Sequence, residues 1–173
     1  MYTMKKLLIF SLALLSLWSC KKDENNTPTN TLPPGLTGRL IGDWELTGVY
    51  YKTSIPNPLN PLQPINVEGD ATAVSGDFVV SYNPNKVVYN YSFSISGGPV
   101  PGSFPVNQDG EATWSVISND TKVLLEEADM DPVIYDVTTN EANLQVWETE
   151  LPFTIPGVGI TVTADIKLTL ERK

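Results

Sequence analysis

The sequence contains no histidine and only one cysteine, Cys20. Without histidine the chain lacks the usual general base near neutral pH, the usual zinc ligand and any Ser-His or Cys-His nucleophile. With one cysteine it cannot form a disulfide within itself. We therefore expect a protein that is not an enzyme and that carries no cofactor and no metal. An enzyme that uses paired carboxylates is the alternative that these absences leave open.

Basic residues are also scarce, with 11 Lys and Arg against 20 Asp and Glu and a formal net charge of -9. The two arginines, Arg39 and Arg172, lie far apart in the sequence. Nucleic-acid binding requires clustered basic side chains that neutralise phosphates, so we expect no nucleic-acid partner. The acidity instead favours the solubility of an exported domain.

The densest acidic segment runs from Glu126 to Asp131 and contains an Asp-x-Asp spacing. A calcium-binding loop also needs a glycine for its turn and a terminal glutamate as bidentate ligand, and this segment has neither. We interpret the segment as a solvated loop between two strands.

Lys5 and Lys6 precede a run from Leu7 to Trp18 that is apolar except for two serines. A basic segment followed by an apolar one is typical of an export signal. As a helix the run would extend about 18 Å, which is shorter than the roughly 30 Å hydrocarbon core of a membrane. We therefore predict that residues 1–19 are a signal peptide.

The segment Leu17-Trp18-Ser19-Cys20 resembles the lipobox of bacterial lipoproteins, in which a leucine and a small residue precede the cysteine. The resemblance implies that Cys20 receives a diacylglyceryl group, becomes the first mature residue and is acylated on its amine, so that palmitate would be incorporated. Two acyl chains suffice for stable anchoring in a membrane. The alternative is a free or buried cysteine behind an ordinary signal.

Lys22, Asp23 and Glu24 follow the cysteine closely. In some Gram-negative lipoproteins a lysine followed by two acids directs export to the outer face of the outer membrane, and the resemblance extends to this order. A solvated charge cluster is the alternative. The next segment, Asn25 to Gly35, is rich in proline and lacks aromatic residues, as is typical of a disordered tether. We expect residues 20–35 to tether a domain to the outer membrane, facing the periplasm or the cell surface.

From Arg39 onward apolar residues recur with a period of two, and no segment shows sustained helical spacing. In Ile160–Glu171 every even-numbered residue is apolar, which predicts a strand with one buried and one wet face. The eight predicted strands are Asp43–Lys52, Asp77–Tyr82, Lys86–Ser96, Glu111–Ser118, Lys122–Glu127, Val133–Thr138, Ala142–Glu150 and Ile160–Glu171. Val67–Val74 is either a ninth strand or an extension of a neighbouring one.

Turn signals, among them Asp109-Gly110, separate these strands. Successive strands joined by short turns favour an up-and-down meander that closes into a barrel, because closure removes exposed sheet edges. We therefore predict an all-β domain over residues 36–173, an antiparallel barrel of eight or nine strands. A two-sheet β-sandwich is the alternative.

Gly42-Asp43-Trp44, at the entry of the first predicted strand, resembles the Gly-x-Trp signature of lipocalins. Together with the lipobox and tether, it makes the chain similar to the lipocalin-like lipoproteins of Gram-negative bacteria. In lipocalins the tryptophan closes one end of the barrel and an arginine near the end of the barrel lies across its ring. The resemblance implies this barrel-closing role for Gly42, Trp44 and Arg172. The alternative is an ordinary core tryptophan beside a frayed terminal arginine.

The inward parity of Tyr89, Tyr91 and Phe93 makes them candidates for lining a ligand pocket. They could equally fill the interior, because side chains alone can fill an eight-stranded barrel. Trp114 and Trp147 differ in parity from some of their apolar neighbours, which suggests that one of them is exposed.

The proline-rich segment from Thr53 to Asn66 follows the first predicted strand. In the position of a lipocalin lid, its apolar residues would cover a cavity; these are Ile55, Leu59, Leu62 and Ile65. Alternatively, the segment packs flat on the barrel wall.

Two functions are consistent with this sequence. The first is a membrane-anchored protein that binds a small apolar or amphipathic ligand. The second is a non-enzymatic accessory lipoprotein with a filled barrel, which contacts an envelope protein or a glycan. The volume of the barrel interior distinguishes the two.

Overall fold

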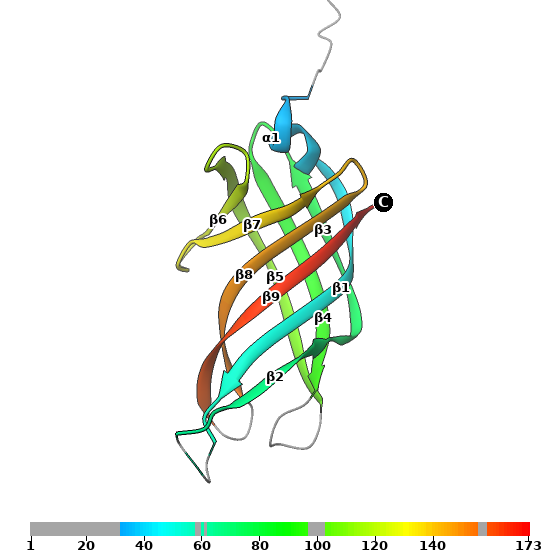
Figure 1. Cartoon of the computed structure of the whole chain (residues 1–173). Coiled ribbons are helices and arrows are strands. Elements are labelled where there is room, and N and C mark those ends of the chain that lie inside the picture. Colours follow the sequence, from blue (N-terminus) through cyan, green and yellow to red (C-terminus); the bar gives the residue numbers. More distant parts are fainter. Residues whose placement is uncertain (1–31, 58–59, 61, 97–102, 156–158) are drawn as a thin grey trace, which may run out of the picture. The chain divides into compact units, whose positions relative to one another are not determined.

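The computed structural model describes residues 32–57, 60, 62–96, 103–155 and 159–173 (Figure 1). Residues 33–173 form one compact unit. The predicted signal peptide, Cys20 and the predicted export signal of Lys22, Asp23 and Glu24 lie outside the described residues. Leu59 of the predicted lid lies outside them as well.

One antiparallel sheet of nine strands, preceded by a short helix, makes up this unit. The elements are α1 (Gly35–Leu40), β1 (Gly42–Ile55), β2 (Ile65–Asp70), β3 (Thr72–Ser81), β4 (Lys86–Ser96), β5 (Ser103–Ile117), β6 (Lys122–Glu127), β7 (Val133–Asn140), β8 (Leu144–Ile155) and β9 (Ile160–Arg172). From β3 onward each strand pairs with the next, and β9 pairs back with β1. The predicted up-and-down barrel is therefore confirmed, and the fold is a closed barrel rather than a sandwich.

One of the nine strands, β2, lies outside the closed barrel. It pairs with the second half of β1, from Tyr50 opposite Asp70 to Ile55 opposite Ile65. β3 pairs with the first residues of β1, Gly42 to Glu45. Eight strands thus close the barrel, and the Val67–Val74 segment is divided between β2 and the start of β3.

The core follows the period of two, with one change of parity inside β1. On β9 every second residue from Val162 to Leu170 is buried. On β1 the buried residues are even-numbered up to Leu46 and odd-numbered from Val49, because a bulge between Leu46 and Gly48 adds a residue. An extra residue in one strand moves the following side chains to the other face, so the bulge keeps Val49 and Tyr51 inside.

One local prediction is wrong. Asp109-Gly110 is not a turn but lies within β5, where Gly110 is opposite Tyr89 of β4. The chain also contains a helix, α1, although no helical spacing is visible in the sequence. Six residues are too few to repeat the helical period, yet Leu36 and Leu40 lie one turn apart and are each only 1% exposed.

Both Trp114 and Trp147 are buried, so the expectation that one is exposed is wrong. The Trp114 Nε1 donates to the Ser81 carbonyl oxygen at 2.9 Å. The Trp147 Nε1 donates to Gln145 Oε1 at 3.5 Å, and Gln145 is itself fully buried. A polar residue, Gln145, therefore forms part of the inward face of β8. The spacing of apolar residues in the sequence does not reveal it, because glutamine is not apolar.

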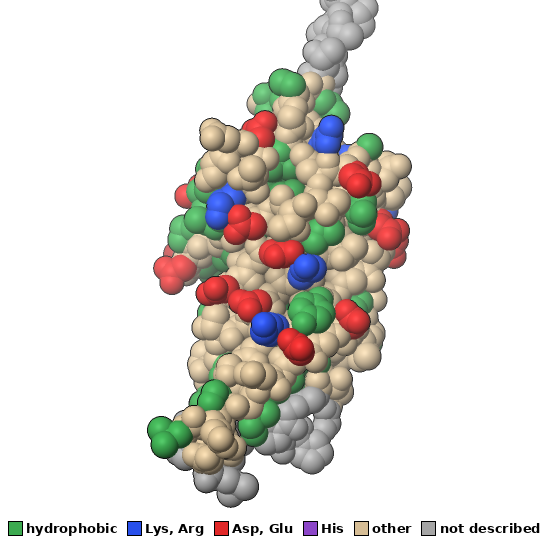
Figure 2. Space-filling model, in the orientation of Figure 1, with side chains coloured by type: hydrophobic (Ala, Val, Ile, Leu, Met, Phe, Trp, Pro, Cys, Tyr) green, Lys and Arg blue, Asp and Glu red, His purple; other side chains and the backbone are tan. Residues whose placement is uncertain are grey.

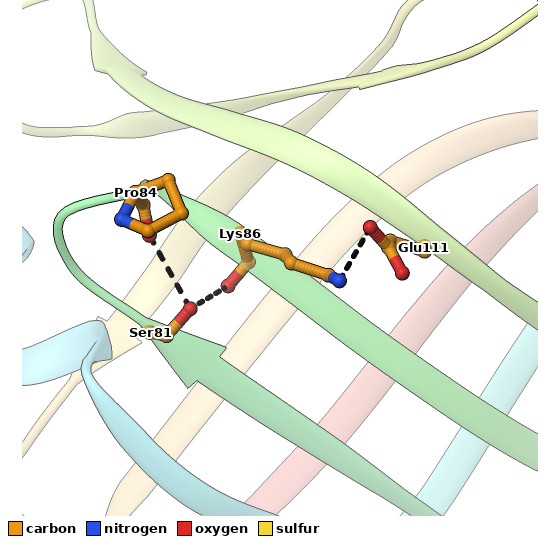
Figure 3. A network of polar contacts seen from close by, with 4 residues as sticks. All are labelled: Ser81, Pro84, Lys86 and Glu111. Carbon is orange, nitrogen blue, oxygen red and sulfur yellow. Dashed lines mark hydrogen bonds and ion pairs between the residues drawn. The ribbon is translucent and has the colours of Figure 1, made fainter.

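Polar contacts hold the turn between β3 and β4 to β5 (Figure 3). The Ser81 hydroxyl lies 3.3 Å from the Pro84 carbonyl oxygen and 3.1 Å from that of Lys86, and donates to them. The Lys86 ammonium lies 2.5 Å from Glu111 Oε1 on β5. Both ends of this ion pair are partly exposed, so it contributes about 0–1 kcal/mol.

Acidic and basic side chains are interspersed on the outer wall shown in Figure 2. Directly opposed residues form two of the ion pairs: Lys122 with Asp136 at 2.8 Å, and Lys167 with Glu148 at 2.9 Å. Opposite charges across neighbouring strands stabilise a sheet modestly and are typical of a solvent-facing wall.

Candidate functional site

The first site is the end of the barrel next to α1, where β1 begins and β9 ends. Trp44 and Arg172 are directly opposed on β1 and β9. The Arg172 guanidinium carbon lies 4.4 Å from the centroid of the Trp44 ring. Trp44 is 1% exposed, and its Nε1 donates to the Leu40 carbonyl oxygen at 2.8 Å. The cation therefore lies over an indole that α1 holds in place.

The Arg172 guanidinium also joins three separate backbone segments. Its Nε donates to the carbonyl oxygen of Ala142 at 2.8 Å, its Nη1 to that of Ile41 at 3.0 Å, and its Nη2 to that of Arg39 at 2.7 Å. A Cβ at Gly42 would overlap the Arg172 Nη1, and the φ of Gly42 is 138°, a value that favours glycine. This geometry gives Gly42, Trp44 and Arg172 a shared structural role at the closed end.

The second site lies on the side of the barrel, where the wall is incomplete. β6 pairs with β5 only along Ala112 to Ile117, and β7 pairs with β8 only along Gln145 to Glu148. Within the described residues, two stretches have no paired strand on this side of the sheet. They are Ser103–Glu111 of β5, beyond the end of its pairing with β6, and Thr149–Ile155 of β8, beyond the end of its pairing with β7. The short hairpin of β6 and β7 therefore covers only part of the wall between β5 and β8.

Two hollows lie along this incomplete part of the wall. One has a volume of about 210 Å³ and is lined by side chains of β4, β5 and β8, including Phe104, Val106 and Phe153. The other has a volume of about 50 Å³ and lies beneath the hairpin of β6 and β7. Its lining consists of Phe78, Tyr89, Tyr91, Ala112, Leu125, Glu127, Met130, Asp131, Val133 and Tyr135. We call this second hollow the tyrosine cavity.

A hydrogen bond between Tyr89 and Glu127 forms one side of the tyrosine cavity. The Tyr89 hydroxyl donates to Glu127 Oε1 at 2.8 Å, which connects β4 to the end of β6. The residue between them on β5 is Gly110, and a Cβ there would overlap Glu127 Oε1 and lie 2.6 Å from the Tyr89 hydroxyl. The absence of a side chain at Gly110 thus makes room for this pair.

Tyr91 and Tyr135 also line the tyrosine cavity. Each is 7% exposed. Neither hydroxyl has a hydrogen-bond partner in the part of the chain that the structure describes, and each oxygen keeps some accessible surface. The tyrosine cavity therefore contains two hydroxyls on buried side chains, each with surface that a ligand or water can reach.

The environment of these tyrosines disfavours their ionised form. Burial, followed by the charge of Glu127, raises the pKa of Tyr91 to about 12. Burial raises the pKa of Tyr135 well above its usual range, with smaller effects from Tyr91, Tyr89 and Glu127. Burial and the hydrogen bond to Glu127 raise the pKa of Tyr89 in the same way. The three hydroxyls therefore stay protonated at neutral pH beside one carboxylate.

The three aromatic residues expected to line a pocket are placed differently from one another. Tyr89 and Tyr91 line the tyrosine cavity, whereas Phe93 does not. Phe93 is 5% exposed and stacks on Tyr91, with ring centroids 6.1 Å apart. Tyr91 in turn stacks on Phe78 at 5.4 Å. The aromatic residues of β3 and β4 therefore fill much of the interior, and two of them border a small cavity.

The three predicted lid residues that the structure describes, Ile55, Leu62 and Ile65, line neither hollow. Ile55 and Ile65 are opposed in the pairing of β1 with β2, where Ile55 is buried and Ile65 half-buried. Leu62 is 91% exposed and so packs neither over a cavity nor on the wall. The described part of this segment is better understood as the end of the β1–β2 ribbon.

Two residues of the tyrosine cavity were not singled out from the sequence. Glu127 belongs to the acidic segment that we interpreted as a solvated loop, and only its pairing with Tyr89 distinguishes it. Tyr135 is the buried centre of the pattern Val133-x-Tyr135-x-Val137, which is visible in the sequence but indistinguishable from ordinary core. The register of β6 against β5 and β7 brings these residues together.

Neither hollow has the size of a site for a whole lipid. Pockets for small molecules usually have volumes of about 300–1,000 Å³. The hollows of about 50 and 210 Å³ are both smaller. The largest fully buried side chains, Trp44, Trp147 and Tyr51 among them, occupy the interior instead.

No protein-family model matches the sequence, and no curated protein is significantly similar to it. The fold alone therefore defines the class, which is a closed antiparallel β-barrel of lipocalin-like architecture with one extra strand. No helix in the described part of the chain is long and apolar enough to cross a membrane. Over the same residues, no group of three or more Asp, Glu, His or Cys side chains is arranged to hold a metal ion.

Replacing Gly110 with alanine tests whether the Tyr89–Glu127 pair needs this glycine. We expect the free energy of unfolding to fall by about 1–3 kcal/mol, because the added methyl group overlaps a packed side-chain pair. Urea denaturation measures the change. Gly48→Ala is the matched control, because a Cβ there meets Thr169 at an ordinary 3.4 Å. Equal effects of the two substitutions would contradict the packing around Gly110.

Proposed function

We propose that this chain is an outer-membrane lipoprotein, anchored through acyl groups on Cys20, whose barrel binds a small amphipathic ligand, or one end of it, in the tyrosine cavity. The lipid anchor holds the barrel at the membrane, and residues 20–35 act as the tether. Lys22, Asp23 and Glu24 are the proposed signal for export to the outer surface. Binding involves no chemical reaction.

The tyrosine cavity is the observation that carries this proposal. It combines aromatic rings, a carboxylate and two hydroxyls that have no hydrogen-bond partner within the described residues, in a space of about 50 Å³. A cavity needs about 10–15 Å³ of this kind of volume to hold one water molecule. The space therefore suits a group of about three to five heavy atoms, and a longer apolar part of the ligand would lie in the adjoining incomplete wall.

An accessory lipoprotein that contacts another envelope protein or a glycan is the second candidate. The unpaired sides of Ser103–Glu111 and Thr149–Ile155, within the described residues, favour it. Unpaired strand edges accept further strands from a partner, and main-chain hydrogen bonds then supply much of the affinity. This candidate predicts that one partner protein co-purifies with the chain. Proline substitutions within Ser103–Glu111 or Thr149–Ile155 should then abolish the co-purification.

The anchor is tested by metabolic labelling with palmitate in a Gram-negative host. We expect the wild-type chain to incorporate the label and to fractionate with the outer membrane. Cys20→Ala should lose the label completely and leave the membrane fraction, because no other cysteine can take the acyl group. Asn25→Ala is the matched control, because it lies beyond the proposed export signal and keeps the thiol. An unlabelled wild-type chain would refute the proposal.

A further inference from the structure

The tyrosine cavity has an arrangement of polar groups that points to one ligand chemistry. Its hydrogen-bonding groups are the hydroxyls of Tyr89, Tyr91 and Tyr135 and the carboxylate of Glu127, with Asp131 at its edge. Among the residues that the structure describes, no lysine or arginine lines it. The side chains therefore offer oxygen acceptors and negative charge, which suits a ligand that is positively charged and donates hydrogen bonds.

We propose that the tyrosine cavity binds the protonated primary amine of a small ligand, with the ammonium held by Glu127 and by the hydroxyls of Tyr91 and Tyr135. This deepens the proposed function, on which it rests, by naming the chemical class of the ligand. An ammonium group has three donors and no acceptor, and these three groups supply matching acceptors.

The burial of the acceptors makes this match specific. Tyr91 and Tyr135 are each 7% exposed and their hydroxyls have no hydrogen-bond partner within the described residues, so a ligand that leaves these hydroxyls unpaired forgoes two hydrogen bonds. Glu127 Oε1 already accepts from Tyr89, and its second oxygen is available to an ammonium. Charge-assisted hydrogen bonds are about twice as strong as neutral ones, which favours an amine over an alcohol of the same size.

The aromatic lining supports a cation over other small polar groups. The rings of Phe78, Tyr89 and Tyr91 lie within 5.4–5.9 Å of one another on one side of the tyrosine cavity. A cation beside aromatic rings is attracted by their quadrupoles. A metal ion fits less well, because Glu127 and Asp131 are the only two acids among the lining residues and metal binding usually recruits more. A whole sugar ring exceeds the available volume.

The entrance lies at the turn between β6 and β7. Met130 is 62% exposed, and Asp131 is exposed beside it, so the mouth of the tyrosine cavity opens to solvent between them. Asp131 places a second negative charge at this mouth, where it would attract a cation before it enters. The ligand tail then leaves through the turn or along the incomplete wall.

Isothermal titration calorimetry of the full-length chain in detergent, at pH 7 and low salt, tests this proposal. We expect saturable binding of n-propylammonium and at least about tenfold weaker binding of 1-propanol. Tetramethylammonium, which has the charge but no N–H donor, should also bind at least about tenfold more weakly. Glu127→Gln should weaken n-propylammonium at least about tenfold, and Tyr135→Phe should weaken it several-fold. Glu148→Gln, on the outer wall, should leave the affinity unchanged.

Equal affinity for propanol or tetramethylammonium, binding that Glu127→Gln does not weaken, or no saturable heat would overturn the proposal. Thermal unfolding of each variant verifies that it folds, and Tyr91→Phe replaces Tyr135→Phe if the latter does not. Vesicles containing phosphatidylethanolamine, with phosphatidylcholine vesicles as control, distinguish a lipid head group from a free amine as the source. Failure of amine binding leaves the palmitate result unaffected, so the anchor and the ligand are tested separately.

Discussion

Replacing Arg172 with methionine should lower the free energy of unfolding by about 3–5 kcal/mol, the largest effect that we expect from one exposed or half-exposed side chain. The guanidinium donates to the carbonyl oxygens of Ala142, Ile41 and Arg39, and it lies 4.4 Å from the Trp44 ring. Hydrogen bonds from charged groups contribute about 1.5–3 kcal/mol each, without full additivity, and the cation over the indole adds about 0.5–2 kcal/mol.

Lys167→Met on the same strand is the matched control for Arg172→Met. Lys167 is nearly half exposed and pairs with Glu148 on the outer wall, so its loss should cost no more than about 1 kcal/mol. Arg172→Lys should give an intermediate loss, because lysine keeps the charge but not the planar fork of donors. Urea denaturation of the three variants measures these differences. Similar losses for Arg172→Met and Lys167→Met would show that Arg172 does not close the barrel.

Alkaline pH should destabilise the barrel through its buried tyrosines. Burial raises the pKa of Tyr91 to about 12, and that of Tyr135 further, whereas tyrosines of the unfolded chain ionise near pH 10. Above pH 10 the unfolded state therefore binds fewer protons than the folded state, and the free energy of unfolding falls as pH rises. For Tyr91 alone, the loss between pH 10 and pH 12 is about 2 kcal/mol.

The tyrosine variants identify the source of this alkaline loss. Tyr91→Phe and Tyr135→Phe should each make the fall in stability between pH 10 and pH 12 less steep, because phenylalanine does not ionise. Tyr82→Phe should leave the steepness unchanged, because Tyr82 is 42% exposed. Urea denaturation at intervals of pH gives the slopes. Identical slopes for all four proteins would contradict the burial of Tyr91 and Tyr135.

The period of two in the sequence was enough to predict the barrel. Strands such as β9 are apolar at every second residue because one face is buried and the other is wet. The opposed positions of Trp44 on β1 and Arg172 on β9 also agree with the parity of the sequence. These features depend on local patterns and on the meeting of the first and last strands, both of which are visible in one sequence.

The tyrosine cavity could not be predicted in the same way, because it depends on register. The pairing of Tyr89 with Gly110, and of Ala112 with Glu127, brings a glycine, a tyrosine and a carboxylate together from three strands. The sequence shows Asp109-Gly110 as a turn signal and Glu127 as part of an acidic loop. The bulge between Leu46 and Gly48 was hidden for a similar reason, since one extra residue changes parity without a distinctive sequence.

Native mass spectrometry of the full-length chain, extracted gently from membranes, tests most directly the claim that an acylated anchor carries a filled barrel. We predict the mass of a chain that begins at Cys20 and bears covalent acyl groups, with no lipid-sized molecule retained in addition. A stoichiometric lipid adduct that dissociates on activation and persists in Glu127→Gln would contradict the filled barrel, because a lipid held by its head group in the tyrosine cavity would be lost with that carboxylate. The mass of an unprocessed, unacylated chain would contradict the anchor.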